Sequence, residues 1–161
     1  MATYAPPLQP RRVETRRAES VAQDNLRALV PIGRVLFSAI FIVSGLGHFT
    51  IGMIDFAAQQ GVPMANVLVP LSGLLAVVGG LSILLGFHAR FGAWLVVLFL
   101  VVVTPAIHHF WTFSDPAARA VQMGMFMKNV AMLGGALLIV FFGAGPLSLD
   151  RARRGHWPST A

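Results

Sequence analysis

Four residues with hydrogen-bonding side chains lie near the ends of long uncharged stretches in this 161-residue chain: His48, His108, Trp111 and Lys128. If these stretches cross a bilayer, the imidazole and ammonium groups are costly inside it unless they snorkel, cap a helix end or meet a partner. Trp111 alone is an ordinary interfacial aromatic residue. Imidazole, ammonium and indole groups at one membrane face suit a quinone-like head group, because its carbonyl oxygens accept hydrogen bonds. A purely structural cluster that ties helix ends together explains the same residues, and both interpretations stay open.

Two further residues extend this candidate site. Arg34 lies about one turn into the first apolar stretch, where a guanidinium either snorkels to the membrane surface or pairs with an acid or a ligand oxygen. Asn129 follows Lys128 and opens the apolar part of the last stretch. We therefore take Arg34, His48, His108, Trp111, Lys128 and Asn129 as candidate cofactor-binding residues.

Metal and thiol chemistry find little support in the sequence. His108 and His109 are adjacent, and on a helix they point about 100° apart, so they do not chelate a metal by themselves. The chain has no cysteine, which excludes a disulfide framework, Cys-ligated zinc and iron–sulfur clusters. We predict no metal site.

The elements that position these residues are membrane-spanning helices. No Lys, Arg, Asp or Glu occurs in residues 35–53, 56–89, 91–114 or 129–149. One helical crossing takes about 20 apolar residues. The sequence therefore predicts an all-α bundle of four transmembrane helices with short loops, roughly at residues 29–49, 65–85, 90–107 and 123–142. A short interfacial helix is expected near residues 54–58.

The remaining sequence divides into tails. We expect a disordered basic N-terminal tail over residues 1–28, which becomes helical near residues 19–27, and a basic C-terminal tail over residues 147–161, on either side of a membrane domain at 29–146. Residues 1–27 lack the apolar core of a signal peptide. The formal net charge of +6 comes mainly from residues in tails and loops, so it indicates membrane topology and lipid contact, with no nucleic-acid partner.

Orientation follows from the basic residues. With four spans, the N-terminal tail, the turn at Arg90 and the arginines at 151, 153 and 154 share one side, while Arg119 and Lys128 lie toward the other. Because cytoplasmic loops are enriched in Lys and Arg, both termini are predicted to be cytoplasmic. Small residues at four-residue spacing, at 72, 76 and 80 and at 131 and 135, predict close helix packing.

Several motifs together resemble the DoxX family of small four-helix bacterial membrane proteins. The motifs are RVLFSAIFIVSGLGH (34–48), GG (79–80), LLG (84–86), HHFW (108–111), FMKN (126–129), GG (134–135) and GPLSLD (145–150). The resemblance implies a multi-pass protein of the bacterial inner membrane, similar to the small subunit of a thiosulfate–quinone oxidoreductase. It places Arg34, His108, Trp111, Lys128 and Asn129 at recurrent polar positions of the family. Many members carry a Glu in the second span, where this chain has Ala76.

The function expected from this resemblance is that of an accessory or membrane-anchor subunit of a quinone-linked redox system. Quinone is the candidate cofactor, and a partner redox protein or a second copy of the chain is the candidate partner. No self-sufficient catalytic motif is present, so the chain is not expected to be an enzyme on its own. A non-enzymatic membrane scaffold is the alternative. A small-molecule transporter is a further alternative, although no inverted repeat is evident.

Overall fold

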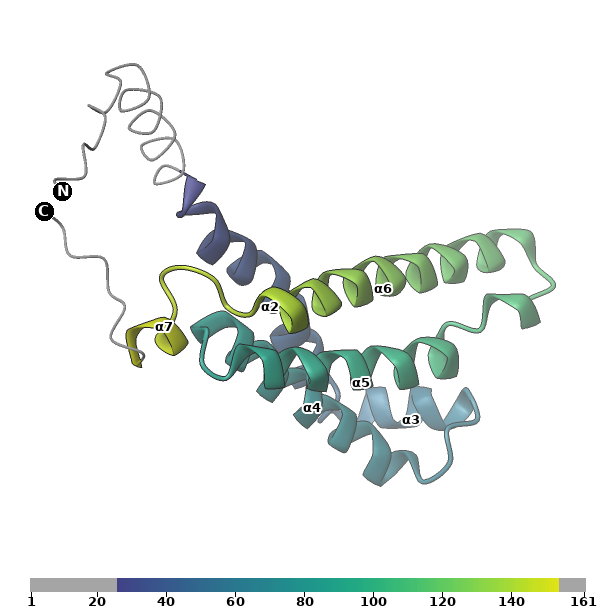
Figure 1. Ribbon diagram of the computed structural model, residues 1–161. Helices are drawn as coiled ribbons and strands as arrows, with labels where there is room; N and C mark the ends of the chain where they lie inside the picture. Colours follow the sequence, from purple (N-terminus) through teal and green to yellow (C-terminus); the bar gives the residue numbers. More distant parts are fainter. Residues whose placement is uncertain (1–25, 154–161) are drawn as a thin grey trace, which may run out of the picture.

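The computed structural model describes residues 26–153 (Figure 1), so the predictions for residues 1–25 and 154–161 lie outside it. The described part of the chain is helical and has no strand. Its elements are α2 (Leu29–Gly47), α3 (Ile51–Gln59), α4 (Ala65–Leu85), α5 (Ala89–Ile107), the 3-10 helix η1 (Phe110–Thr112), α6 (Pro116–Phe142) and α7 (Leu149–Arg153).

Four of these helices, α2, α4, α5 and α6, are long and apolar enough to span a membrane, which confirms the predicted all-α architecture. Helix α3 lies in the loop after the first span, as expected. Helix α6 differs from the prediction, because it begins at Pro116 and not near residue 123. The Asp115 carboxylate caps it by accepting from the Ala118 N–H at 2.7 Å, and Pro116 suits the first helical turn.

The spanning helices pack in the order α2, α4, α5, α6. Glycines permit the close approach: a Cβ on Gly73 of α4 would lie 2.7 Å from the Gly45 carbonyl oxygen of α2, and one on Gly79 would lie 2.8 Å from the Gly92 carbonyl oxygen of α5. Between these contacts, Phe41, Ile83, Val96 and Leu100 are fully buried. Of the predicted 72–80 stripe, Ala76 is fully buried, and a Cβ on Gly45 would lie 3.0 Å from its Cβ. A Cβ on Gly80 would lie 2.9 Å from the Ile42 side chain of α2, so these two residues permit close helix packing, as predicted.

Helix α6 packs mainly against α5 and η1. It also meets α2, where Gly135 makes room for the Phe37 ring, since a Cβ there would lie 2.8 Å from the ring edge. Ala136 is buried beside this contact, whereas Ala131 is exposed. Of the predicted pair at 131 and 135, only Gly135 therefore lies at a helix contact.

Candidate functional site

A cavity of about 420 Å³ lies among α2, α3, α4, α5 and α6, at the end of the bundle where α2 and α5 end. Its lining is mostly aliphatic and aromatic. Four of the predicted site residues line it: His48, His108, Lys128 and Asn129. The structure therefore brings together residues from three spans that are distant in sequence.

His48 ends α2 and is held by a relay to α4. Its Nδ1 lies 2.8 Å from the Ser72 Oγ, and the Ser72 hydroxyl donates to the Val69 carbonyl at 2.7 Å. A hydroxyl has one proton, so Ser72 accepts from His48, and Nδ1 carries the ring proton. In the neutral ring, Nε2 is then a hydrogen-bond acceptor.

His108 ends α5 and is fixed in the same way by α6. Its Nδ1 lies 2.9 Å from the Gln122 Oε1, which only accepts, so Nδ1 is again the donor. Neutral His108 therefore also keeps Nε2 as an acceptor. Gln122 lies in the first turns of α6, ahead of the span predicted from sequence, which is why this partner was missed.

Lys128 and Asn129 enter the cavity from the middle of α6. Asn129 is buried, and its Nδ2 donates to the Thr104 Oγ1 of α5 at 3.1 Å. The Lys128 Nζ lies 3.4 Å from the Met125 Sδ. Because a thioether is a weak acceptor, the ammonium keeps most of its donor capacity for a ligand or water.

Arg34 and Trp111 do not line this cavity. Arg34 lies toward the opposite end of α2, is 7% exposed and donates from Nη2 to the Leu147 carbonyl at 2.6 Å. Its Nε and Nη1 are buried without a hydrogen-bond partner in the described part of the chain. Trp111 is 54% exposed and packs on Phe110 and Phe126, an arrangement typical of an aromatic residue at a membrane interface.

The chemistry available in the cavity is hydrogen bonding next to an apolar surface. Two imidazoles offer acceptors when neutral, and one ammonium offers donors. Leu68, Leu98 and Val102 line the cavity and are also exposed on the spanning helices, so the cavity borders the surface that faces lipid. Among residues 26–153, no group of three or more His, Asp or Glu side chains is placed to hold a metal ion.

Comparisons with known proteins identify relatives across most of the chain. The sequence profile of the DoxX family matches residues 29–109. The chain is 34% identical to the inner membrane protein YqjF of Escherichia coli over 130 residues, which cover 80% of this chain and 94% of YqjF. It is 30% identical to the inner membrane protein YphA of the same organism, over 76% of this chain and 89% of YphA. No solved structure matches the chain significantly.

Proposed function

Because the chain belongs to the DoxX family and is an integral inner-membrane protein, we propose that it is an accessory or membrane-anchor subunit of a quinone-linked redox system. The head group would occupy the cavity lined by His48, His108 and Lys128. The observation that carries this proposal is the position of these three side chains around one cavity that borders the lipid-facing surface.

The size and lining of the cavity support a small lipid-soluble ligand. Binding sites for small molecules usually enclose about 300–1,000 Å³ and combine an apolar lining with a few polar groups. The volume of about 420 Å³ lies at the lower end of that range, which fits a single ring better than a large cofactor. Exposed Leu68, Leu98 and Val102 would lie beside the isoprenoid tail.

Each polar residue has a distinct role in this proposal. The Nε2 atoms of neutral His48 and His108 would accept hydrogen bonds, and eventually protons, from the hydroxyl groups of a reduced quinol. The Lys128 ammonium would donate to a carbonyl oxygen of the oxidised form. Asn129 would act as a positioning residue, because its bond to Thr104 fixes α6 beside α5. A partner redox protein would supply or remove the electrons.

The test is the quinone content of the purified protein. We expect stoichiometric quinone in mass spectrometry of lipid extracts from protein purified in mild detergent, and its loss in Lys128→Ala. Arg119→Ala is the matched control, because Arg119 is an exposed cation on the same helix and does not line the cavity. The melting temperature of each variant verifies that the bundle is folded.

The possible results separate the redox proposal from the scaffold alternative. Quinone retained in Arg119→Ala and lost in folded Lys128→Ala supports the redox role. Absence of quinone from all three proteins contradicts it and favours a scaffold, for which a co-purifying protein partner would be sought next. Equal quinone in all three proteins indicates that it is carried over with bulk lipid.

A further inference from the structure

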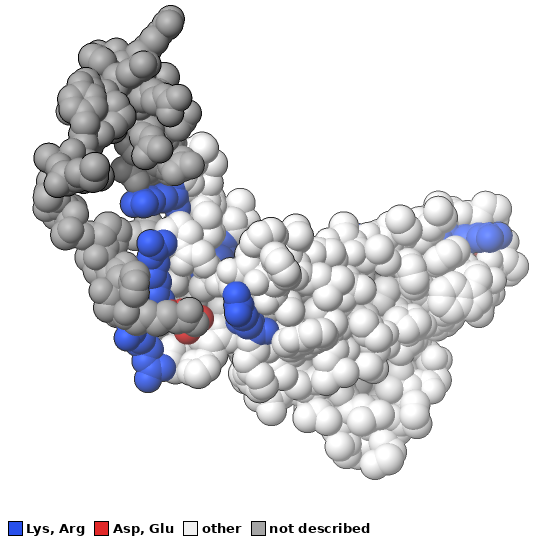
Figure 2. Space-filling model, viewed as in Figure 1, with Lys and Arg blue, Asp and Glu red and all other residues white. Residues whose placement is uncertain are grey.

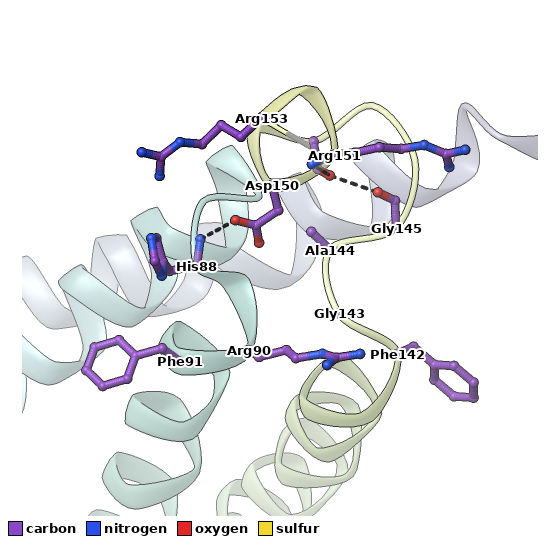
Figure 3. A pocket seen from close by; sticks show the side chains of 11 residues that line it. His88, Arg90, Phe91, Phe142, Gly143, Ala144, Gly145, Asp150, Arg151 and Arg153 are labelled. Atoms are coloured by element: carbon purple, nitrogen blue, oxygen red, sulfur yellow. Dashed lines mark hydrogen bonds between the residues drawn. The ribbon is translucent and has the colours of Figure 1, made fainter. Parts of the chain in front are cut away.

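A second hollow lies at the opposite end of the bundle, where α5 begins and α6 ends (Figure 3). Its volume is about 650 Å³, and it is formed by the start of α5, the segment 143–148 and α7. A backbone hydrogen bond of 2.8 Å from the Asp150 N–H to the Gly86 carbonyl joins α7 to the turn after α4. The last described residues are thus folded onto the turn between α4 and α5.

The charge of this hollow is mainly positive. Three arginines line it, Arg90, Arg151 and Arg153, against one carboxylate, Asp150. That carboxylate is engaged at the start of α5, because its two oxygens accept from the His88 N–H at 2.8 Å and the Ala89 N–H at 3.1 Å. The negative charge of Asp150 is therefore offset by the positive end of the α5 dipole, and an anion in the hollow meets a net excess of guanidinium groups.

Arg90 lies between the polar hollow and the apolar surface. Its Nη2 donates to the Phe141 carbonyl at 3.1 Å, which leaves most of its five N–H donors for other acceptors. Gly143 makes room for the side chain, since a Cβ there would lie 3.3 Å from the Arg90 Nε. Phe91 and Phe142 flank Arg90 in Figure 3 and are 62% and 71% exposed. An amphipathic ligand would meet charge and apolar surface side by side.

We propose that this hollow binds the phosphodiester head group of an anionic glycerophospholipid. Guanidinium groups match the geometry of phosphate oxygens, and basic pockets at the ends of transmembrane helices lie at head-group depth. The acyl chains then extend along α5 and α6, past Phe91 and Phe142. A soluble phosphate compound shares the head-group chemistry but has no acyl chain to pack against these exposed rings. Contact with the rings therefore distinguishes a phospholipid from a soluble phosphate compound.

The experiment is a lipid titration of the full chain, followed by native mass spectrometry in detergent. The probes are phosphatidylglycerol and phosphatidylcholine with identical acyl chains, and inorganic phosphate as competitor. We expect phosphatidylglycerol to bind more tightly than phosphatidylcholine, and Arg90→Gln/Arg153→Gln to weaken it roughly tenfold to thirtyfold, since each basic residue near an anionic surface contributes modestly. Millimolar phosphate should not displace the lipid.

Two single variants serve as controls. Arg119→Gln removes an exposed cation at the other end of the bundle, and Arg27→Gln removes one just before α2, outside the hollow. Both should bind phosphatidylglycerol like the wild type. The proposal would be overturned if the two lipids bound equally or if phosphate displaced the lipid. It would also be overturned if either control lost as much affinity for phosphatidylglycerol as the double variant. If the double variant melts earlier than the wild type, Arg153→Gln alone decides, because Arg153 is exposed on α7. Phosphatidylglycerol binding by folded Arg153→Gln that equals wild-type binding would then overturn the proposal.

Discussion

Several polar side chains that line the cavity are held by a neighbouring helix. His48 of α2 donates to Ser72 of α4, and Asn129 of α6 donates to Thr104 of α5. In a bilayer no water replaces a lost partner, so such bonds orient side chains as well as join helices. The structural and the ligand-binding interpretations of this cluster are therefore compatible. A histidine whose Nδ1 is bonded to a neighbouring helix can still offer its Nε2 to a ligand in the cavity.

Replacement of Thr104 by Val measures how much one such hydrogen bond contributes to the free energy of unfolding. The change keeps the side-chain shape and removes the acceptor of the buried Asn129 amide. We expect the free energy of unfolding in detergent to fall by about 0.5–1.5 kcal/mol, the usual range for hydrogen bonds between transmembrane helices. Thr112→Val is the control, since the Thr112 hydroxyl bonds to His109 in the exposed η1 loop. An equal effect of both changes would contradict a special role for the buried pair.

Sequence reasoning identified the polar residues but not all of their partners. Charged and imidazole side chains stand out in apolar stretches because they are rare there, whereas Ser72 fits equally well as a small packing residue. Arg34 and His48 both belong to the candidate binding residues predicted from sequence, although the helical rise separates them by about 21 Å along α2. This separation follows from the sequence alone if the first span is one continuous helix. Arg34 therefore lies at the opposite end of the bundle from His48.

At the scale of the helices, glycine position determines how closely α2 and α4 approach. We expect Gly73→Ala to lower the free energy of unfolding by about 1–3 kcal/mol, because its Cβ would lie 2.7 Å from both the Gly45 carbonyl oxygen and the His48 Cβ. Gly134→Ala on α6 is the matched control, with no atom within 4 Å of the added Cβ. Gly134→Ala should raise the free energy of unfolding by up to about 1 kcal/mol, because alanine has a higher helix propensity than glycine. Thermal unfolding in detergent measures both, and equal shifts would contradict the packing argument.

The helices also differ in how well hydropathy locates them. The sequence places the second span at residues 65–85, where α4 lies, because the stretch is apolar and is followed by Gly86. In the structure Gly86 ends this helix with a φ of +62°, which suits glycine. The start of α6 was missed, since its first turns contain polar residues such as Arg119 and Gln122 that lower local hydropathy. The cap at Asp115 and Pro116 was the available signal. With 27 residues, α6 is about 40 Å long and exceeds a hydrocarbon core of about 30 Å.

Across the whole molecule, basic residues are distributed unequally between the two ends. Figure 2 shows Lys and Arg gathered at the end that carries α7, with one basic patch at the far end, where α6 begins. Arg90, Arg151 and Arg153 line the hollow at the first end, while Lys128 lies at the cavity toward the second. By the charge rule for loops, we infer that the α7 end is cytoplasmic and the cavity of His48 faces the periplasmic side.

Labelling of single introduced cysteines tests this orientation directly, because the chain has none of its own. Ser114→Cys lies between η1 and α6, and Ala152→Cys lies on α7, at opposite ends of the bundle. In intact spheroplasts an impermeant maleimide should label Ser114→Cys and leave Ala152→Cys unlabelled, and inverted vesicles should reverse the pattern. The opposite pattern would show that the bundle has the reverse orientation, with the arginine-lined hollow at the outer leaflet. Labelling of both sites from the same side would contradict the four crossings, since α6 separates these two positions.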